Sequence, residues 1–243
     1  MLDPHEALNI QQLFGTSLSQ VQKDHAISHV LSALRNFKTE LVFYGGTGLA
    51  RTFLEHGRLS EDIDFFTSNR DALLRELDTI PELIVQEFPE AYWATKPSQI
   101  TEPGKALLVC QQGVQIEVQT ISTQTRGWKD IPIAEREIHQ RYSDAPGIKL
   151  RVPTVDGFSA MKLVAWFDRG TSRDLFDLEG LTRLAPVSSD TRELVARLLG
   201  LNLTHAMIDR KVVGQWKDDL AHQTRLEITE EQALARVLEW WGK

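Results

Sequence analysis

Apolar side chains recur at helical spacing in the first part of the chain and alternate with short β-branched or aromatic runs. Recurrence every three or four positions marks one face of a helix, whereas a short apolar run bounded by glycines marks a strand. Helices are therefore predicted over residues 5–14, 21–37, 47–57 and 70–78. Strands are predicted over residues 41–44 and 62–66. A β-hairpin is predicted over residues 105–121, with its turn near Gln112 and Gly113.

Strand patterns nearly vanish after Val152, and helical spacing dominates the rest of the chain. Helices are predicted within residues 154–170, 171–184, 191–201 and 229–241. Pro146, Gly147 and Pro153 mark a linker between the two parts, because proline and glycine interrupt regular structure. The pattern predicts an α+β fold: a domain with a mixed sheet flanked by helices over residues 1–150, then a helical domain over residues 151–243.

Charge and cysteine content narrow the class of protein. The chain has 27 Lys and Arg residues against 34 Asp and Glu residues, a formal net charge of −7, which argues against unspecific coating of nucleic acid. Its single cysteine, Cys110, excludes an intrachain disulfide. The first residues do not resemble a secretory leader, and no apolar run is long enough to span a membrane. We expect a cytoplasmic protein without a membrane partner.

The familiar sequence motifs of other site types are missing. The seven histidines do not form an HExxH pattern and there is no cysteine pair, which argues against a structural zinc site. P-loop, dinucleotide-binding and GxSxG signatures are also lacking in the sequence. The chemistry must therefore come from a different combination of residues.

Two aspartates on a predicted strand form the strongest candidate. Asp62 and Asp64 are two positions apart, so their carboxylates project from the same face, and carboxylate oxygens are the ligands that Mg²⁺ prefers. A solvated turn is the structural alternative, but the flanking apolar residues argue against it. Upstream, Gly45, Gly46 and Thr47 lie between a strand and a helix, where backbone N–H groups can approach a phosphate. This order predicts two-metal phosphoryl transfer.

Glu117 is the candidate for a third acidic ligand. It shares one strand face with Gln115 and Gln119, while Ile116 and Val118 occupy the other. A polar solvent-facing side of a strand has the same pattern, so the spacing alone favours the structural reading.

Arg58 and Ser60 precede the aspartates, where they could contact a triphosphate or simply complete the loop after Gly57. Lys162 lies in an otherwise apolar helix. It could contact a phosphate or leaving group in a cleft between the two domains, which we favour, or lay its stem along the core.

The segment RDLFDL, residues 173–178, adds Arg173, Asp174 and Asp177 to the candidates. Structural roles are equally compatible with their spacing. Thr171 and Asp174 fit an N-terminal capping box, and Arg173 and Asp177 fit an ion pair along one helix face.

Together these motifs carry a family resemblance. The segment FYGGTGLARTFLEHGRLSEDIDFF, the IEV strand with Glu117, the helix with Lys162 and the RDLFDL segment resemble the AbiEii-type nucleotidyltransferases. These are the toxin halves of abortive-infection and toxin–antitoxin systems and include the MenT enzymes. The GGT and DID motifs are typical of the wider DNA polymerase β-like superfamily, and lysine followed by RDxxDL is typical of this family. The motifs extend from about Leu41 to Leu178.

The resemblance implies roles for individual residues. Gly46 and Thr47, with Gly45, would hold the triphosphate. Asp62 and Asp64 would bind Mg²⁺ or Mn²⁺. In the same way, Glu117 would be the second-motif acid, Lys162 would meet the nucleotide phosphates, and Asp174 would orient the acceptor or act as a base.

The implied activity is transfer of an NMP from an NTP to an acceptor hydroxyl. The family resemblance favours the 3′ end of tRNA as acceptor, or a protein hydroxyl, and implies a cognate antitoxin as partner. Two alternatives stay open: transfer to a small molecule, and a non-catalytic nucleotide-binding module.

Overall fold

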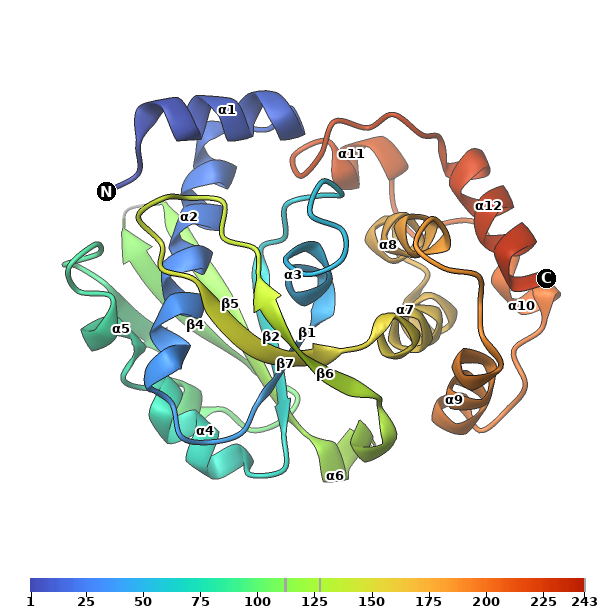
Figure 1. Cartoon of the computed structure of the whole chain (residues 1–243), viewed down its shortest axis with the longest axis horizontal. Helices are drawn as coiled ribbons and strands as arrows, with labels where there is room; N and C mark the ends of the chain where they lie inside the picture. The colour runs from blue at the N-terminus through green and yellow to red at the C-terminus, as the bar shows by residue number, and fades with distance from the viewer. Residues whose placement is uncertain (112, 127, 243) are drawn as a thin grey trace.

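A mixed sheet of seven strands is the centre of the protein, in the spatial order β3-β4-β5-β2-β1-β7-β6. The computed structural model describes residues 1–111, 113–126 and 128–242. The strands are β1 (Val42–Tyr44), β2 (Asp62–Thr67), β3 (Tyr92–Thr95), β4 (Lys105–Gln111), β5 (Val114–Ser122), β6 (Ile133–Ile138) and β7 (Ile148–Pro153). Helices flank this sheet and further helices follow it, which confirms the predicted α+β class (Figure 1).

Strand β2 lies in the middle of the sheet, antiparallel to β1 and parallel to β5. Its alternation is as predicted: Ile63 and Phe65 are fully buried on one face, and Asp62 and Asp64 belong to the other. Because β2 is hydrogen-bonded to a neighbour on each side, its two carboxylates sit on a strand that has little freedom to move.

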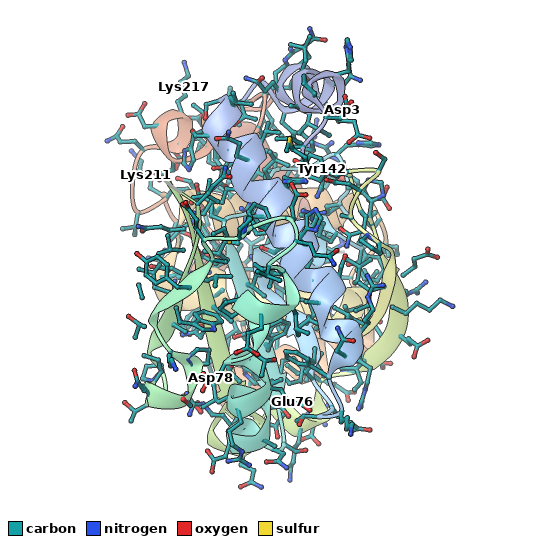
Figure 2. All side chains as sticks on the ribbon, turned by 90° about the vertical axis from the view of Figure 1, so that its left-hand side faces the viewer. Asp3, Glu76, Asp78, Tyr142, Lys211 and Lys217 are labelled. Atoms are coloured by element: carbon teal, nitrogen blue, oxygen red, sulfur yellow. The ribbon has the colours of Figure 1, made fainter. Side chains whose placement is uncertain are left out.

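Helix α2 (Leu18–Ala33) lies across one face of the sheet, and Figure 2 looks directly onto it. The predicted helices of this part of the chain are confirmed, with ends shifted by a few residues. The remaining helices here are α1 (Pro4–Phe14), α3 (Gly45–Ala50), α4 (Arg70–Leu77), α5 (Ile80–Leu83) and α6 (Thr123–Arg126).

The helices predicted after residue 150 are also confirmed, and they gather on one side of the molecule (Figure 1). They are α7 (Val155–Arg169), α8 (Ser172–Thr182), α9 (Ser189–Leu199) and α12 (Glu230–Gly242), with two short helices, α10 (His205–Ile208) and α11 (Trp216–Leu220), that the pattern does not predict. No helix in the described part of the chain is both long enough and apolar enough to cross a membrane.

Three strands escape the sequence pattern. The linker predicted between Pro146 and Pro153 is wrong, because this stretch contains β7, which pairs with β1 in parallel and with β6 in antiparallel fashion. β3 and β6 form the two edges of the sheet, where side chains are partly exposed and alternation is weak. The hairpin is confirmed by the antiparallel pairing of β4 and β5, although Gln112 lies outside the described residues.

Helix α3 differs from its prediction at both ends. It begins at Gly45, so the two glycines are its first residues, and it ends at Ala50 instead of continuing to Gly57. The carbonyl of Leu49 accepts hydrogen bonds from the backbone N–H groups of both Phe53 and Leu54, which turns the chain away from helical geometry.

A buried ion pair fixes α2 against the chain after α3. Arg51 and Asp24 are each 1% exposed, and Arg51 Nη2 donates to Asp24 Oδ1 at 2.7 Å. The hydroxyl of Tyr142, labelled beside α2 in Figure 2, donates to Asp24 Oδ2 at 3.0 Å. Both oxygens of this buried carboxylate therefore have donors, as a charge removed from water requires.

Arg51→Ala should destabilise the fold by about 3 kcal/mol, because it leaves Asp24 buried with a weaker partner. Arg141, 3.6 Å from the same carboxylate, limits the loss. The measurement is urea denaturation followed by circular dichroism. The exposed Arg75 on α4 provides a matched control, whose replacement by alanine should change stability by no more than about 0.5 kcal/mol. Equal stabilities of the two variants would contradict the assignment.

Candidate active site

The three acidic residues predicted to share a site lie on adjacent strands. β2 and β5 pair in parallel, with Asp62 opposite Glu117 and Asp64 opposite Gln119. Paired residues of neighbouring strands present their side chains on the same face of a sheet. The structure therefore brings Asp62, Asp64 and Glu117 together on one face.

A lysine that the sequence analysis does not identify joins this group. Nζ of Lys105, at the start of β4, lies 2.5 Å from Glu117 Oε2 and 3.5 Å from Asp62 Oδ2. Burial alone would lower the pKa of Lys105, but the hydrogen bond to Glu117 and the charges of Asp62 and Asp64 outweigh it and raise the pKa. The carboxylates of Asp62, Asp64 and Glu117 thus stabilise a positive charge placed beside them.

Asp64 is the least solvated of the three acids. Burial, reinforced by the negative charge of Asp62, raises the pKa of Asp64 from 3.8 to about 6, while Lys105, Lys162 and Arg169 oppose the shift. A carboxylate whose charge is poorly solvated gains more than an exposed one from a nearby cation.

The glycines of α3 pack directly against functional side chains. Gly45 has φ of 75°, a left-handed conformation, and a Cβ atom there would overlap the Asp64 carboxylate. A Cβ atom on Gly46 would lie 2.5 Å from Arg58 Nη2 and 3.1 Å from Ser60 Oγ. Both positions therefore need glycine, which leaves the backbone of this turn open toward Asp64, Arg58 and Ser60.

Thr47 faces inward. It is 2% exposed, and its hydroxyl donates a hydrogen bond to the backbone carbonyl of Asp62. Thr47 therefore ties the first turn of α3 to the start of β2.

Arg58 and Lys162 share one buried carboxylate. Arg58 binds both oxygens of Asp177 on α8, through Nε at 2.9 Å and Nη2 at 2.8 Å, and Lys162 Nζ on α7 lies 2.6 Å from Asp177 Oδ2. Burial acts to raise the pKa of Asp177, but the two cations outweigh it and lower the pKa. The structural alternative of an Arg173–Asp177 ion pair does not form: Arg173 is exposed, and Asp177 is buried with Arg58 and Lys162 as its partners.

Asp174 is fully buried, and both of its carboxylate oxygens accept hydrogen bonds. Arg169 binds it through Nε at 2.7 Å and Nη2 at 2.8 Å, Thr171 donates its hydroxyl at 2.6 Å, and Lys162 Nζ lies 3.6 Å away. The alternative of a capping box does not form, because the hydrogen bonds to this carboxylate come from side chains and Thr171 makes no side-chain cap. Despite burial, these donors keep the pKa of Asp174 well below its usual range.

A pocket of about 250 Å³ opens between the strand residues and α7. Gly45, Gly46 and Asp64 line it from the side of the sheet, and Lys162 and Arg169 line it from α7. Aromatic and apolar side chains complete its wall: Tyr44, Trp128, Phe158 and Met161. The pocket combines two carboxylates, Asp64 and Asp168, with two cations and an aromatic wall, which suits a charged ligand that carries a flat ring.

The site residues that the sequence analysis does not identify include Lys105, Gln119, Trp128 and Arg169. Gln119 is the one with a visible signal, since it shares a strand face with Glu117. The others reach the site through pairing or packing over long sequence distances, which local spacing does not encode.

Gly45→Ala should lower the melting temperature by about 2–8 °C, since a left-handed conformation costs a residue with a side chain roughly 1–2 kcal/mol. The Cβ atom would also displace the Asp64 carboxylate. The control is Gly147→Ala, where the structure leaves open space for the methyl group and the melting temperature should not change. A thermal unfolding scan of both variants tests this, and equal shifts would refute it.

Asp174→Asn should destabilise the protein at neutral pH by about 1–3 kcal/mol, because it weakens charged hydrogen bonds in a buried place. The folded-state pKa of Asp174 is lowered, so its carboxylate stabilises the native state above its ordinary value of 3.8 and loses that effect as the pH falls further. The difference between wild type and variant should therefore shrink below about pH 4.

Denaturation with urea at pH 7 and at pH 3 measures this difference. Asp218→Asn serves as the control, because Asp218 is exposed. A gap between wild type and Asp174→Asn that is the same at both pH values would contradict the predicted sign.

Solved structures resemble this fold. MenT4, a nucleotidyltransferase toxin from Mycobacterium tuberculosis H37Rv, superposes with a TM-score of 0.68 at 19% identity, over 97% of this chain and 88% of that chain. The antibiotic-resistance factor ANT(2'')-Ia superposes with a TM-score of 0.49 at 14% identity, over 74% of this chain and 93% of its own. No match was found among curated proteins.

A family model agrees with the motifs and the fold. The model of the nucleotidyl transferase AbiEii toxin of type IV toxin–antitoxin systems matches residues 29–238, most of the chain. The matched range includes the glycines of α3, the aspartates of β2 and the helices that carry Lys162 and Asp177. The chain therefore belongs to the AbiEii family of nucleotidyltransferase toxins.

Proposed function

We propose that this protein is a Mg²⁺- or Mn²⁺-dependent enzyme that moves an NMP from an NTP to an acceptor hydroxyl. The observation that carries the proposal is the position of Asp64. Its carboxylate adjoins the backbone of Gly45 at a pocket that two cations, Lys162 and Arg169, also line. A carboxylate, an open glycine turn and opposed cations are what a metal-bound triphosphate requires.

The residues present fit a divalent cation. Asp62, Asp64 and Glu117 offer only oxygen ligands, which suit Mg²⁺, and the ammonium group of Lys105 already lies between Asp62 and Glu117 as a positive charge. We assign the cation to the two aspartates, with Glu117 as the third ligand. When bound, the cation supplies charge stabilisation to the phosphoryl group being transferred.

The nucleotide would be held by the α3 turn and by α7. Gly45 and Gly46 line the pocket without side chains, so phosphate oxygens could approach their backbone, and Ser60 lies beside Gly46. Lys162 lines the pocket, where its ammonium group can meet the phosphates. Thr47 supports the turn through its bond to β2.

Arg58 and Asp174 fit positioning roles better than direct contact with a substrate. Arg58 is 4% exposed, and its guanidinium is bonded to Asp177 and to Gln223. Asp174 is 0% exposed, and its oxygens accept from Arg169 and Thr171. We propose that these two residues, together with Asp177, orient Lys162 and the glycine turn. Arg173, which is exposed, remains a secondary candidate of the site.

Two domains would then form the cleft, with the boundary near residue 150, where β7 completes the sheet up to Pro153 and α7 begins at Val155. The domain of residues 1–150 supplies the carboxylates and the glycine turn, and the helical domain of residues 151–243 closes the site from the side of α7. Lys162 and Arg169 on the wall opposite Asp64 support this division.

For the acceptor we favour the 3′ end of a tRNA, in keeping with toxin activity in the cytoplasm and a cognate antitoxin as partner. A type IV toxin family implies such a partner and an NTP substrate. The alternatives are transfer to a protein hydroxyl, transfer to a small molecule, and nucleotide binding without turnover. The assay below distinguishes each of them from transfer to tRNA.

Asp62→Ala and Asp64→Ala should each lower nucleotidyl transfer by about a hundredfold or more, because several kcal/mol of charge stabilisation depend on these ligands. The assay incubates purified protein with Mg²⁺, each α-³²P-labelled NTP in turn, and total tRNA or cell extract. Label in tRNA supports the proposed acceptor, and label in protein or in a small molecule replaces it.

Asp71→Ala is the matched control, since Asp71 is an exposed aspartate on α4 outside the site, and its activity should equal that of wild type. Circular dichroism of each variant separates loss of chemistry from loss of fold. Full activity in either site variant would overturn the mechanism, and nucleotide binding without transfer to any acceptor would favour the binding module.

A further inference from the structure

A second group of metal-ligating side chains lies outside the candidate active site. His25, His29, Glu87 and Asp144 each place one ligand atom so that all four atoms lie within 4.8 Å of one another. None of the four lines the pocket beside Asp64. They come from three separate segments: helix α2, the turn after α5, and the loop between β6 and β7. The HExxH and cysteine patterns used to judge zinc in the sequence cannot detect such a set.

The two histidines point at the same place. They are four residues apart on α2, hence on one helix face, and their Nε2 atoms lie 3.2 Å apart. Two ligands about 2.0–2.1 Å from a tetrahedral ion lie roughly 3.3–3.4 Å from each other. The observed separation of the two Nε2 atoms is therefore close to that of two nitrogens bound to one ion. Without an ion, the same separation allows a hydrogen bond between the two rings.

Asp144 completes this geometry. Asp144 Oδ1 lies 3.1 Å from His25 Nε2 and 3.5 Å from His29 Nε2. Both separations match the spacing of neighbouring ligands around one ion. The three side chains thus need little rearrangement to bind a common centre.

The aromatic surroundings hold both rings in place. The Tyr142 ring packs edge-on against His25 with centroids 5.0 Å apart, and Phe88 lies 5.8 Å from His25 and 5.7 Å from His29. This packing fixes the two imidazole rings where their Nε2 atoms face each other and Asp144.

The carboxylates of the group already attract a cation. The amino group of Met1 lies 2.5 Å from Glu87 Oε2 and 2.9 Å from Asp144 Oδ2. Met1 itself is exposed, so a metal ion could displace this group at little cost in packing. The two carboxylates together carry the charge that would neutralise a dication.

We propose that His25, His29, Glu87 and Asp144 form a second metal site, which binds a transition-metal dication such as Zn²⁺ and joins α2 to the segments around Glu87 and Asp144. Two imidazole nitrogens suit zinc and its neighbours, whereas Mg²⁺ prefers a set of oxygen ligands. We assign this site a structural role, because the ion would connect three segments of the chain. None of its four ligands lines the pocket beside Asp64.

The test uses the full chain, free of any affinity tag and treated with a chelator. Titration with Zn²⁺ against a chromophoric chelator should reveal a site that is retained in Asp64→Ala and weakened at least about tenfold in His29→Gln and in Asp144→Asn. His205→Gln is the matched control, because His205 is an exposed histidine outside the group, and it should bind like wild type. Excess Mg²⁺ should not displace the zinc.

Two further measurements protect the test against misfolded variants. At Zn²⁺ about a hundredfold above its Kd, the melting temperature of wild type should rise by about 5–10 °C, and that of His29→Gln by less. Wild type loaded with Co²⁺ should show the absorption bands of a nitrogen-bound, four-coordinate ion. His29→Gln loaded with Co²⁺ should not show them. Equal zinc affinity in wild type, His29→Gln and Asp144→Asn, or no zinc binding by wild type, would overturn the proposal.

Discussion

The chain of buried charges between the sheet and the C-terminal helices determines how the rest of the site is arranged. Asp177 lies between Arg58 and Lys162, and Asp174 lies between Lys162 and Arg169. In a poorly solvated interior, an anion that loses its cation is strongly destabilising. The helices α7 and α8 therefore cannot shift against the loop before β2 without leaving a charge unpaired, and this constraint keeps Lys162 at the wall of the pocket.

Much of the fold could be predicted because its elements carry strong local patterns. The alternation in DIDFF identifies a strand buried on one face, and the long helices after residue 150 show clear apolar periodicity. β7 could not be predicted in the same way, because Pro146, Gly147 and Pro153 around it are typical of a linker, whereas pairing with β1 and β6 overrides that local preference. β6 lies at an edge, where exposure removes the alternation that identifies a strand.

The candidate site was predictable where residues act within one segment. The spacing of Asp62 and Asp64 and the pair of glycines before them follow from strand and turn geometry. Lys105 could not be predicted, because it meets Glu117 only through the pairing of β4 with β5. Arg58 also lay beyond local reasoning, since the spacing offers a phosphate contact or a loop residue, and its actual partners, Asp177 and Gln223, come from distant parts of the chain.

The position of β7 between β1 and β6 has a consequence for the order in which the protein becomes competent during translation. The carboxylates of β2 leave the ribosome early, but β1 gains its second neighbour only when β7 has emerged, and Arg58 gains its carboxylate only with Asp177. The last partner of Arg58, Gln223, comes from the final part of the chain. During synthesis the chain therefore carries its acids for a long stretch without the helices that complete the pocket.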